Sequence, residues 1–216
     1  MHLNRNLFGA LAVCAALSAP LASLAALVGP VETNRTAFDA RVGTQGTDAF
    51  ADLAAGSLGL PPLNRIAGSF SYNAVAANGL FALMDGGPLT TDTAADSLTL
   101  SAFSSSVYGF GADFSVDPSM SAGTLTFTYN NVDLLYTLDI PVNSAGSFFV
   151  GFVFGSPIDT SQIKITSSQL DINVPVFLAV DNLTLASAVP ELGTFPLIAF
   201  GAAALFAASL RRKRGA

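Results

Sequence analysis

The strongest constraint on the fold is a two-residue alternation of apolar and polar side chains in the middle of the chain. In GTLTFTYNNVDLLYTLDI, the first run places Leu125, Phe127 and Tyr129 on one face of a strand. Asn130-Asn131 can then adopt positive φ, which predicts a two-residue hairpin turn. The second run alternates again, and its apolar face would carry Val132, Leu134, Tyr136, Leu138 and Ile140.

Turn signals divide such apolar runs about every ten residues, which is typical of an antiparallel sandwich. SFFVGFVFG repeats the pattern, with Phe148, Val150, Phe152 and Phe154 on one face. No helical period long enough for a βαβ crossover occurs after residue 45. We therefore predict an all-β fold, an antiparallel jelly-roll-like β-sandwich over residues 45–187. A short helix and linker would precede it in residues 26–44, with Asn34 as the N-cap.

Residues 1–25 have the features of a secretory signal peptide. Arg5 precedes a nearly continuous apolar run that ends in the small residues Ser23-Leu24-Ala25, which predicts cleavage after Ala25. An N-terminal membrane anchor is an alternative that Pro20 disfavours. A lipoprotein signal at Cys14 is another, which is disfavoured because the apolar run continues past the cysteine.

Cleavage at this position would remove the only cysteine and the only histidine of the chain, Cys14 and His2. The mature protein would then contain no thiol, disulfide or imidazole. It could build neither a Ser-His-Asp nor a Cys-His nucleophile, nor a zinc site of the usual His/Cys type. We therefore expect the protein not to be an enzyme.

The charge of the region between Ala26 and Pro190 is strongly acidic. It holds four basic residues against one glutamate and thirteen aspartates, a net charge of −10. Such a surface repels nucleic acid, so we expect no nucleic-acid partner. It suits calcium, neutral glycans or simple solubility.

Asp181 is the best candidate for a metal ligand. In VFLAVDNLTLA, alternation places it on the same face as Phe177, Ala179, Leu183 and Leu185, where a carboxylate needs a partner. The first strand could supply Asp48 or Asp52, and oxygen ligands of this kind suit calcium. Alternatively, Asp181 accepts hydrogen bonds from backbone amides near a strand end. We expect no other cofactor.

The aspartates also allow a second class of function. Glycoside hydrolysis needs two carboxylates across a cleft, and thirteen aspartates make such a pair arithmetically available. No local pattern singles out a pair, which favours solvated loop acids. A secreted aspartate-dependent glycan hydrolase therefore stays the less favoured alternative.

The C-terminus has the layout of a membrane span. Leu192–Leu210 is 19 residues without a charge, roughly 28 Å as a helix, which is enough to cross a hydrocarbon core. The basic residues Arg211, Arg212, Lys213 and Arg214 follow at once. By the positive-inside rule, they would stay in the cytoplasm with the sandwich outside.

The order of parts in residues 188–216 resembles the PEP-CTERM sorting signal. The matching residues are Val189-Pro190-Glu191-Leu192-Gly193, then the apolar run and the basic end; Leu192 stands where a second proline is usual. The resemblance implies a Gram-negative bacterium that makes exopolysaccharide. It also implies an exosortase-like membrane protease as a partner, which detaches the protein at this step.

The β-rich region carries a second resemblance, to domains that often accompany this signal. The segments are GFGADFSV (109–116), SFFVGFVFGSPIDTSQIKIT (147–166) and FLAVDNLTLA (177–186). The resemblance implies a jelly roll akin to carbohydrate-binding modules.

Together these features predict a non-catalytic exported protein. It would pass through an inner-membrane intermediate to the cell surface or extracellular matrix of a biofilm, where it could adhere or associate with extracellular polysaccharide. A permanently anchored, periplasmic-facing protein is the alternative that Leu192 favours.

Overall fold

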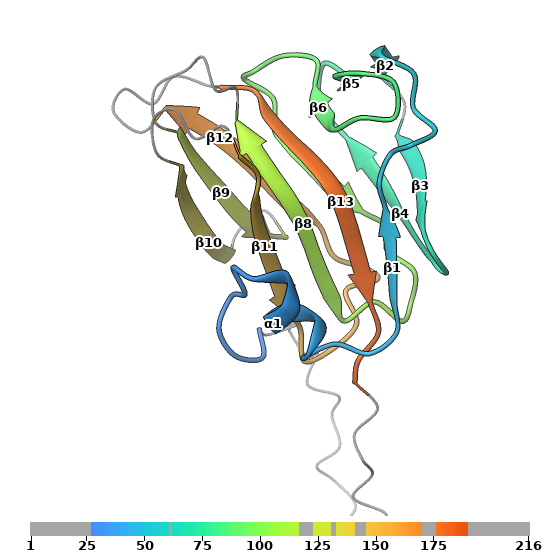
Figure 1. The fold of residues 1–216 in the computed structure, drawn as a ribbon, viewed down its shortest axis with the longest axis vertical. Coiled ribbons are helices and arrows are strands. Elements are labelled where there is room, and N and C mark those ends of the chain that lie inside the picture. The colour runs from blue at the N-terminus through green and yellow to red at the C-terminus, as the bar shows by residue number, and fades with distance from the viewer. Residues whose placement is uncertain are drawn as a thin grey trace, which may run out of the picture.

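The computed structural model describes residues 27–60, 62–116, 123–130, 133–140, 146–169 and 176–189. These residues form two antiparallel β-sheets that pack face to face (Figure 1). The all-β sandwich predicted from the alternation is therefore confirmed. The predicted signal peptide and the sorting residues from Pro190 onward lie outside the described residues.

The larger sheet contains seven strands, which are β1 (Gln45–Asp48), β2 (Gly56–Gly59), β5 (Leu80–Ala82), β6 (Leu89–Thr91), β8 (Gly109–Val116), β11 (Phe148–Val153) and β13 (Leu178–Ala186). Their hydrogen-bonded order is β11-β8-β13-β6-β5-β2, and β1 pairs with β13 beside this path. Strands β6 and β1 share one side of β13. Strand β6 pairs with the beginning of β13, and β1 pairs with its end.

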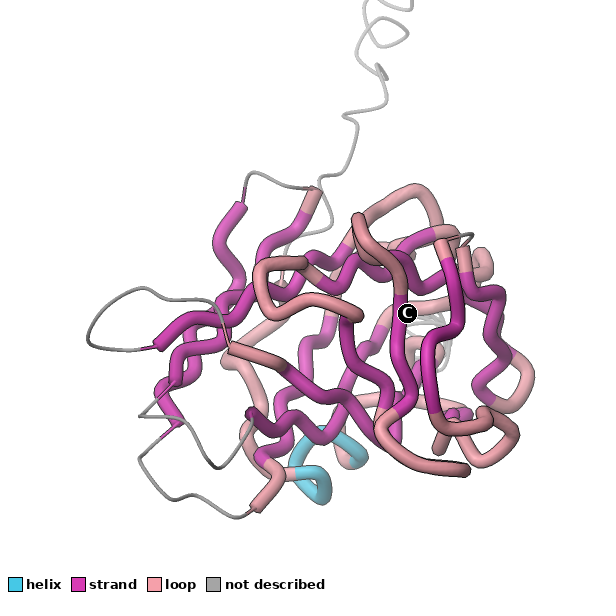
Figure 2. Tube along the Cα trace, turned by 90° about the horizontal axis from the view of Figure 1, so that it is seen from above, coloured by secondary structure: helices cyan, strands magenta, loops and turns pink. Residues whose placement is uncertain are grey.

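The smaller sheet contains six strands, which are β3 (Leu63–Ala67), β4 (Phe70–Val75), β7 (Leu98–Ser101), β9 (Gly123–Tyr129), β10 (Asp133–Ile140) and β12 (Ile163–Gln169). Their order is β10-β9-β12-β7-β4-β3. Viewed from above, strands make up most of the described chain, and the short helix lies to one side of them (Figure 2).

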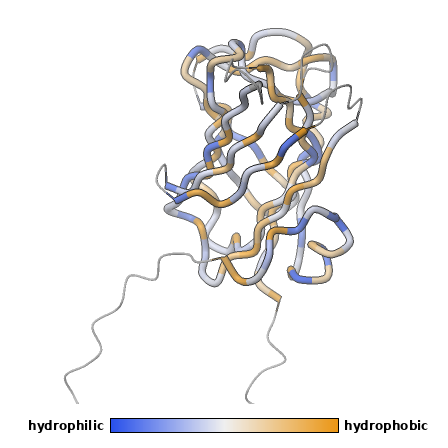
Figure 3. The backbone as a smooth tube through the Cα atoms, turned by 90° about the vertical axis from the view of Figure 1, so that its left-hand side faces the viewer, coloured by the Kyte–Doolittle hydropathy of each residue, from blue (hydrophilic) through white to orange (hydrophobic). Residues whose placement is uncertain are grey.

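The core between the sheets is built from the faces that the alternation predicts. Leu125, Phe127 and Tyr129 of β9 are buried, as are Phe152 of β11 and Phe154 just after that strand. The ring of Phe127 meets Phe114 edge-on at 4.9 Å and Phe152 at 5.5 Å between centroids, geometries that aromatic pairs prefer. The tube in Figure 3 changes repeatedly between hydrophobic and hydrophilic colours along its strands.

Two details of the predicted hairpin are wrong. Tyr129 pairs with Asp133, so three residues rather than two connect β9 to β10, although Asn130 does have a positive φ of 49°. A register shift between Leu134 and Tyr136 then interrupts the alternation. The bulge places Leu134 and Tyr136 on opposite faces: Tyr136 pairs with the buried Phe127, whereas Leu134 pairs with Thr128 and is 64% exposed.

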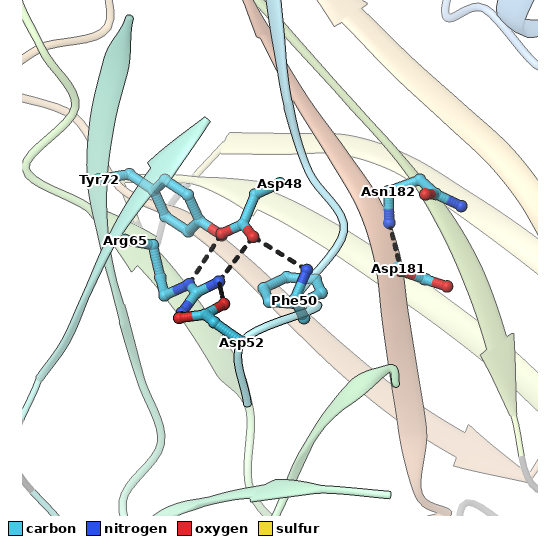
Figure 4. A network of polar contacts seen from close by, with 7 residues as sticks. All are labelled: Asp48, Phe50, Asp52, Arg65, Tyr72, Asp181 and Asn182. Carbon is cyan, nitrogen blue, oxygen red and sulfur yellow. Dashed lines mark hydrogen bonds and ion pairs between the residues drawn. The ribbon is translucent and has the colours of Figure 1, made fainter. Parts of the chain in front are cut away.

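A buried ion-pair network joins the two sheets at β1 and β3. Arg65 of β3 donates from Nε and Nη2 to both carboxylate oxygens of Asp48 on β1, at 2.8 and 2.7 Å. Its Nη1 and Nη2 also donate to both oxygens of Asp52, at 2.8 and 2.6 Å (Figure 4). The Tyr72 hydroxyl and the Phe50 amide donate to Asp48 as well, so every oxygen of this buried carboxylate is bonded.

The network changes the acidity of its members. The hydrogen bonds that Arg65 donates to Asp48 raise the pKa of Arg65 above its already high ordinary value. Burial, followed by the nearby Asp48 charge, raises the pKa of the Tyr72 hydroxyl, which therefore stays protonated as a donor. The hydrogen bonds from Arg65 lower the pKa of the exposed Asp52.

The helix α1 (Arg35–Asp39) covers part of the outer face of the larger sheet. Asn34 caps it, because its side chain accepts a hydrogen bond from the Ala37 amide, as predicted. The Phe38 ring lies against Phe149 at 5.5 Å, over the paired glycines Gly111 and Gly151. A Cβ at Gly151 would approach the Phe38 ring to 2.6 Å, so these glycines make room for the helix.

The two ends of the described chain lie at the same end of the sandwich, beside α1 (Figure 1). Leu27 forms a β-bridge with Phe154, and Phe154 is linked through Tyr108 to Ala186, the last residue of β13. Within the described residues, no helix combines the length and the apolar character needed to cross a bilayer.

The Arg65 network yields a test of what holds the sheets together. Replacing Arg65 by methionine would leave Asp48 buried without its cation, so we expect Arg65→Met to lower the free energy of unfolding by about 3–5 kcal/mol. Urea denaturation of the mature protein, followed by circular dichroism, measures this loss. Lys164→Met is the matched control, because Lys164 has no ion-pair partner among the described residues, and its effect should stay within about 0.5 kcal/mol. Equal losses for the two variants would contradict the assignment.

Candidate binding groove

A groove of about 450 Å³ lies on the outer face of the larger sheet, at the end of β13 that is remote from Leu27 and Val189, the ends of the described chain. This volume lies within the range of ordinary ligand sites. Side chains of β5, β6, β8 and β13 contribute to it. The groove is lined by Phe81, Leu83, Thr90, Thr91, Asp92, Ser115, Val116, Phe177, Leu178 and Ala179.

The walls of the groove are aromatic and aliphatic. Phe177, just before β13, is 38% exposed, and Leu83, just after β5, is 49% exposed. Phe81 of β5 is half-buried and lines the same groove. Apolar side chains left in contact with solvent at one concave place are a common sign of a binding surface.

Polar groups are spaced among these apolar residues. The hydroxyl of Thr90 donates to the Leu178 carbonyl and that of Thr91 to the Thr93 carbonyl, which fixes both side chains. Asp92 accepts a hydrogen bond from the Ser57 hydroxyl at 3.4 Å, so its carboxylate keeps acceptor capacity. The groove therefore offers hydroxyl and carboxylate groups between apolar walls.

The outer face continues from the groove toward α1 as a polar row. Ala179 pairs with Ser115 across β13 and β8, and the next outward pair is Asp181 with Asp113. Arg35 of α1 donates to Asp113 at 3.1 Å, while Asp181 accepts from the amide of the following residue at 2.7 Å. This local bond matches the alternative reading of Asp181 as an acceptor for backbone amides.

The predicted face of Asp181 is partly wrong. The register of β13 on β8 shifts between Asp181 and Thr184, and Asn182 has a φ of 48°. This bulge reverses the alternation, so Leu183 and Leu185 enter the core, whereas Asp181 faces outward together with Ala179. Asp181 is therefore not a carboxylate in the core.

The three residues predicted to bind calcium do not come together. Asp48 pairs with Leu183 of β13 and faces the core, on the opposite side of the sheet from Asp181 (Figure 4). The cation between Asp48 and Asp52 is the guanidinium of Arg65. No group of three or more His, Cys, Asp or Glu side chains suited to a metal occurs within the described ranges. The residues present therefore do not fit the predicted site.

Sequence reasoning missed the groove itself. The alternation predicts Phe177, Ala179 and Asp181 on one face, as observed, but that face is the outer face of the sheet rather than the predicted interior. The signal that could have located the groove is the aromatic residue Phe177 on the same outward strand face as Ala179 and Asp181. The contribution of Phe81 depends on the pairing of β5 with β6, which local pattern does not specify. Of the sorting residues, only Val189 is described, and it is exposed.

Arg65 also determines the expected response to calcium. A calcium ion could use Asp48 and Asp52 only by displacing a guanidinium that is bound to both carboxylates through two hydrogen bonds each. We therefore expect neither added Ca²⁺ nor a chelator to shift the melting temperature, Tm, of the mature protein. Differential scanning calorimetry with each addition measures this, with magnesium as the control ion. A Tm that rises with Ca²⁺ and falls with chelator would restore the calcium hypothesis.

No protein-family model matches the chain, and no curated protein is significantly similar to it.

Proposed function

We propose that this protein is an exported, non-catalytic surface protein that binds a neutral glycan in the groove on its larger sheet. The observation that carries the proposal is that Phe81 and Phe177 line one groove together with the hydroxyl-bearing residues Thr90, Thr91 and Ser115. A jelly-roll arrangement akin to carbohydrate-binding modules is part of the same proposal. The two antiparallel sheets of the sandwich support it.

The chemistry of the groove favours a sugar over other ligands. The C–H faces of a pyranose ring pack on aromatic rings, and its hydroxyls need hydrogen-bond partners at the ring edge. Phe81 and Phe177 suit the first need, and the oxygens of Ser115 and Asp92 suit the second. An acyl chain would leave those polar groups without partners, which is costly in a buried contact.

The charge of the protein favours a neutral glycan over an acidic one. The region from Ala26 to Pro190 has a net charge of −10, and the groove itself contains Asp92. All three arginines of the described part are engaged with carboxylates. The negative charge of the protein would therefore repel a uronic-acid polymer, and the paired arginines do not offset this repulsion.

The address of the protein is the second part of the proposal. Residues 1–25 would direct export, and the segment from Val189 to Gly193 would be recognised by an exosortase-like protease after Leu192–Leu210 has inserted in the inner membrane. The product would be a protein on the cell surface or in an exopolysaccharide matrix. Permanent anchoring of the unprocessed chain is the alternative.

Glycan binding can be tested with single substitutions in the groove. On a glycan array, we expect the mature protein to bind neutral oligosaccharides, and Phe177→Ala to weaken that binding about tenfold or more, as loss of a central aromatic contact does. Ile66→Ala is the matched control, because Ile66 is 70% exposed on the smaller sheet, and it should bind as the wild type does.

Three results on the array would contradict this assignment. They are no binding to any neutral glycan, equal binding by both variants, and release of new reducing ends from a bound glycan. The last would favour the alternative of an aspartate-dependent hydrolase.

The processing sites can be tested by mass spectrometry of the protein from its native cell. We expect a mature N-terminus at Ala26 and a C-terminus within Val189–Gly193, because the small residues before Ala26 and the proline–acid step are the expected recognition elements. A surface fraction that retains Arg211–Arg214 would show permanent anchoring instead.

A further inference from the structure

The last residue that the sandwich holds firmly lies close to the expected membrane span. Ala186 ends β13, and Ser187 is fixed on both sides of its backbone: its amide donates to the Thr44 carbonyl and its carbonyl accepts from the Gly43 amide, both at 2.9 Å. The uncharged run begins at Leu192. Four residues, 188–191, therefore separate Ser187 from the expected span.

This tether is short compared with the thickness of the lipid headgroups. The five Cα–Cα steps from Ser187 to Leu192 span at most about 18 Å when the chain is fully extended. The headgroup region occupies roughly 5–8 Å on each side of the hydrocarbon core. Even a fully extended tether would leave only about 10 Å between the sandwich and the headgroup surface, which is about the diameter of one helix.

The N-terminal connection leads to the same end of the molecule. The bridge between Leu27 and Phe154 holds the start of the described chain there, and only Ala26 separates Leu27 from the predicted signal peptide. The α1 helix lies at this end too (Figure 1). Both connections to a membrane would therefore emerge beside α1.

The α1 end does not carry charge that would attract lipid. Arg41 is bonded to Glu32 and to the carbonyls of Pro30 and Val28, while Asp39 is exposed. Attraction to anionic headgroups requires clusters of lysine and arginine, each worth about 1 kcal/mol. Any contact of this end with the bilayer would depend on the tether.

From these observations, we propose that the α1 end of the sandwich is held against the outer lipid headgroup surface while the C-terminal span is in the membrane. This inference rests on the proposed function, because it requires that Leu192–Leu210 inserts. The groove then points away from the bilayer, since it lies at the opposite end of β13, eight residues or about 26 Å from Ala186. A protease that cuts at Val189–Gly193 would have to act within the thin layer between sandwich and lipid.

Single-cysteine labelling of the full-length chain tests this orientation. In a Cys14→Ser background without other thiols, Ala40→Cys places a fluorophore beside α1 and Ala77→Cys places one on the turn after β4, at the other end of the sandwich. Both alanines are exposed, so the pair is matched. In phosphatidylcholine vesicles with nitroxide-labelled headgroups, we expect quenching several-fold stronger at position 40 than at position 77.

A longer tether provides the second arm of the experiment. A Gly-Ser insertion of about ten residues between Ala188 and Val189 lets the sandwich move away, so quenching at position 40 should fall toward that at position 77. Equal quenching at the two positions, or quenching at position 40 that the insertion does not change, would overturn the proposal. Extraction of the vesicles with alkaline carbonate keeps the two hypotheses apart. A chain that is washed off refutes membrane insertion itself, whereas a retained chain without the difference refutes only the orientation.

Discussion

The ion pair between Arg65 and Asp48 is the polar interaction that fixes strand β1 of the larger sheet to the smaller sheet. Strand β1 is four residues long and pairs with β13 along one side, so its own ladder holds it weakly. Asp48 at its end reaches across the core to Arg65 and Tyr72 of the smaller sheet. A bidentate pair specifies direction as well as distance, and the buried carboxylate can be accommodated only in this register. The loop after β1 is fixed by the guanidinium of Arg65, through Asp52.

The outer face of the larger sheet is divided into a covered part and an open part. Paired glycines in β8 and β11 allow Phe38 of α1 to pack directly on the backbone, and Arg35 lies over Phe149 at 4.6 Å. Farther along the same face, no element of the described chain takes the place of α1 over Phe81 and Phe177. The bulge at Asp181 lies between the two parts: before it, Ala179 lines the groove, and after it, Ala186 packs against Phe38 of α1. A binding surface and a docking surface can therefore share one sheet.

Sequence reasoning predicted the parts of the fold that follow from local alternation. Phe127 and Phe152 alternate with outward side chains over whole strands, and their burial followed directly. The errors fall at bulges, where a one-residue shift reverses the faces: Leu134 in β10 and Asp181 in β13. The ion pair between Asp48 and Arg65 joins strands of different sheets, and nothing in the local pattern of either strand specifies that contact. The groove could not be predicted for the same reason, since its walls come from strands that meet only through the sheet order.

The place where the protein is anchored would affect how strongly its groove binds a polysaccharide. If the groove binds polysaccharide as proposed, each copy would make only a weak contact, because a concave site of about 450 Å³ reaches few sugar rings. Copies held in a common membrane, all with their grooves pointing outward, would bind one long glycan with an effective concentration far above that of free protein. Release by proteolysis would remove this gain in avidity without changing the groove. The position of the ends of the described chain opposite the groove is therefore as important to the proposed function as the residues that line it, since an anchor beside Phe177 would turn the same groove toward the lipid.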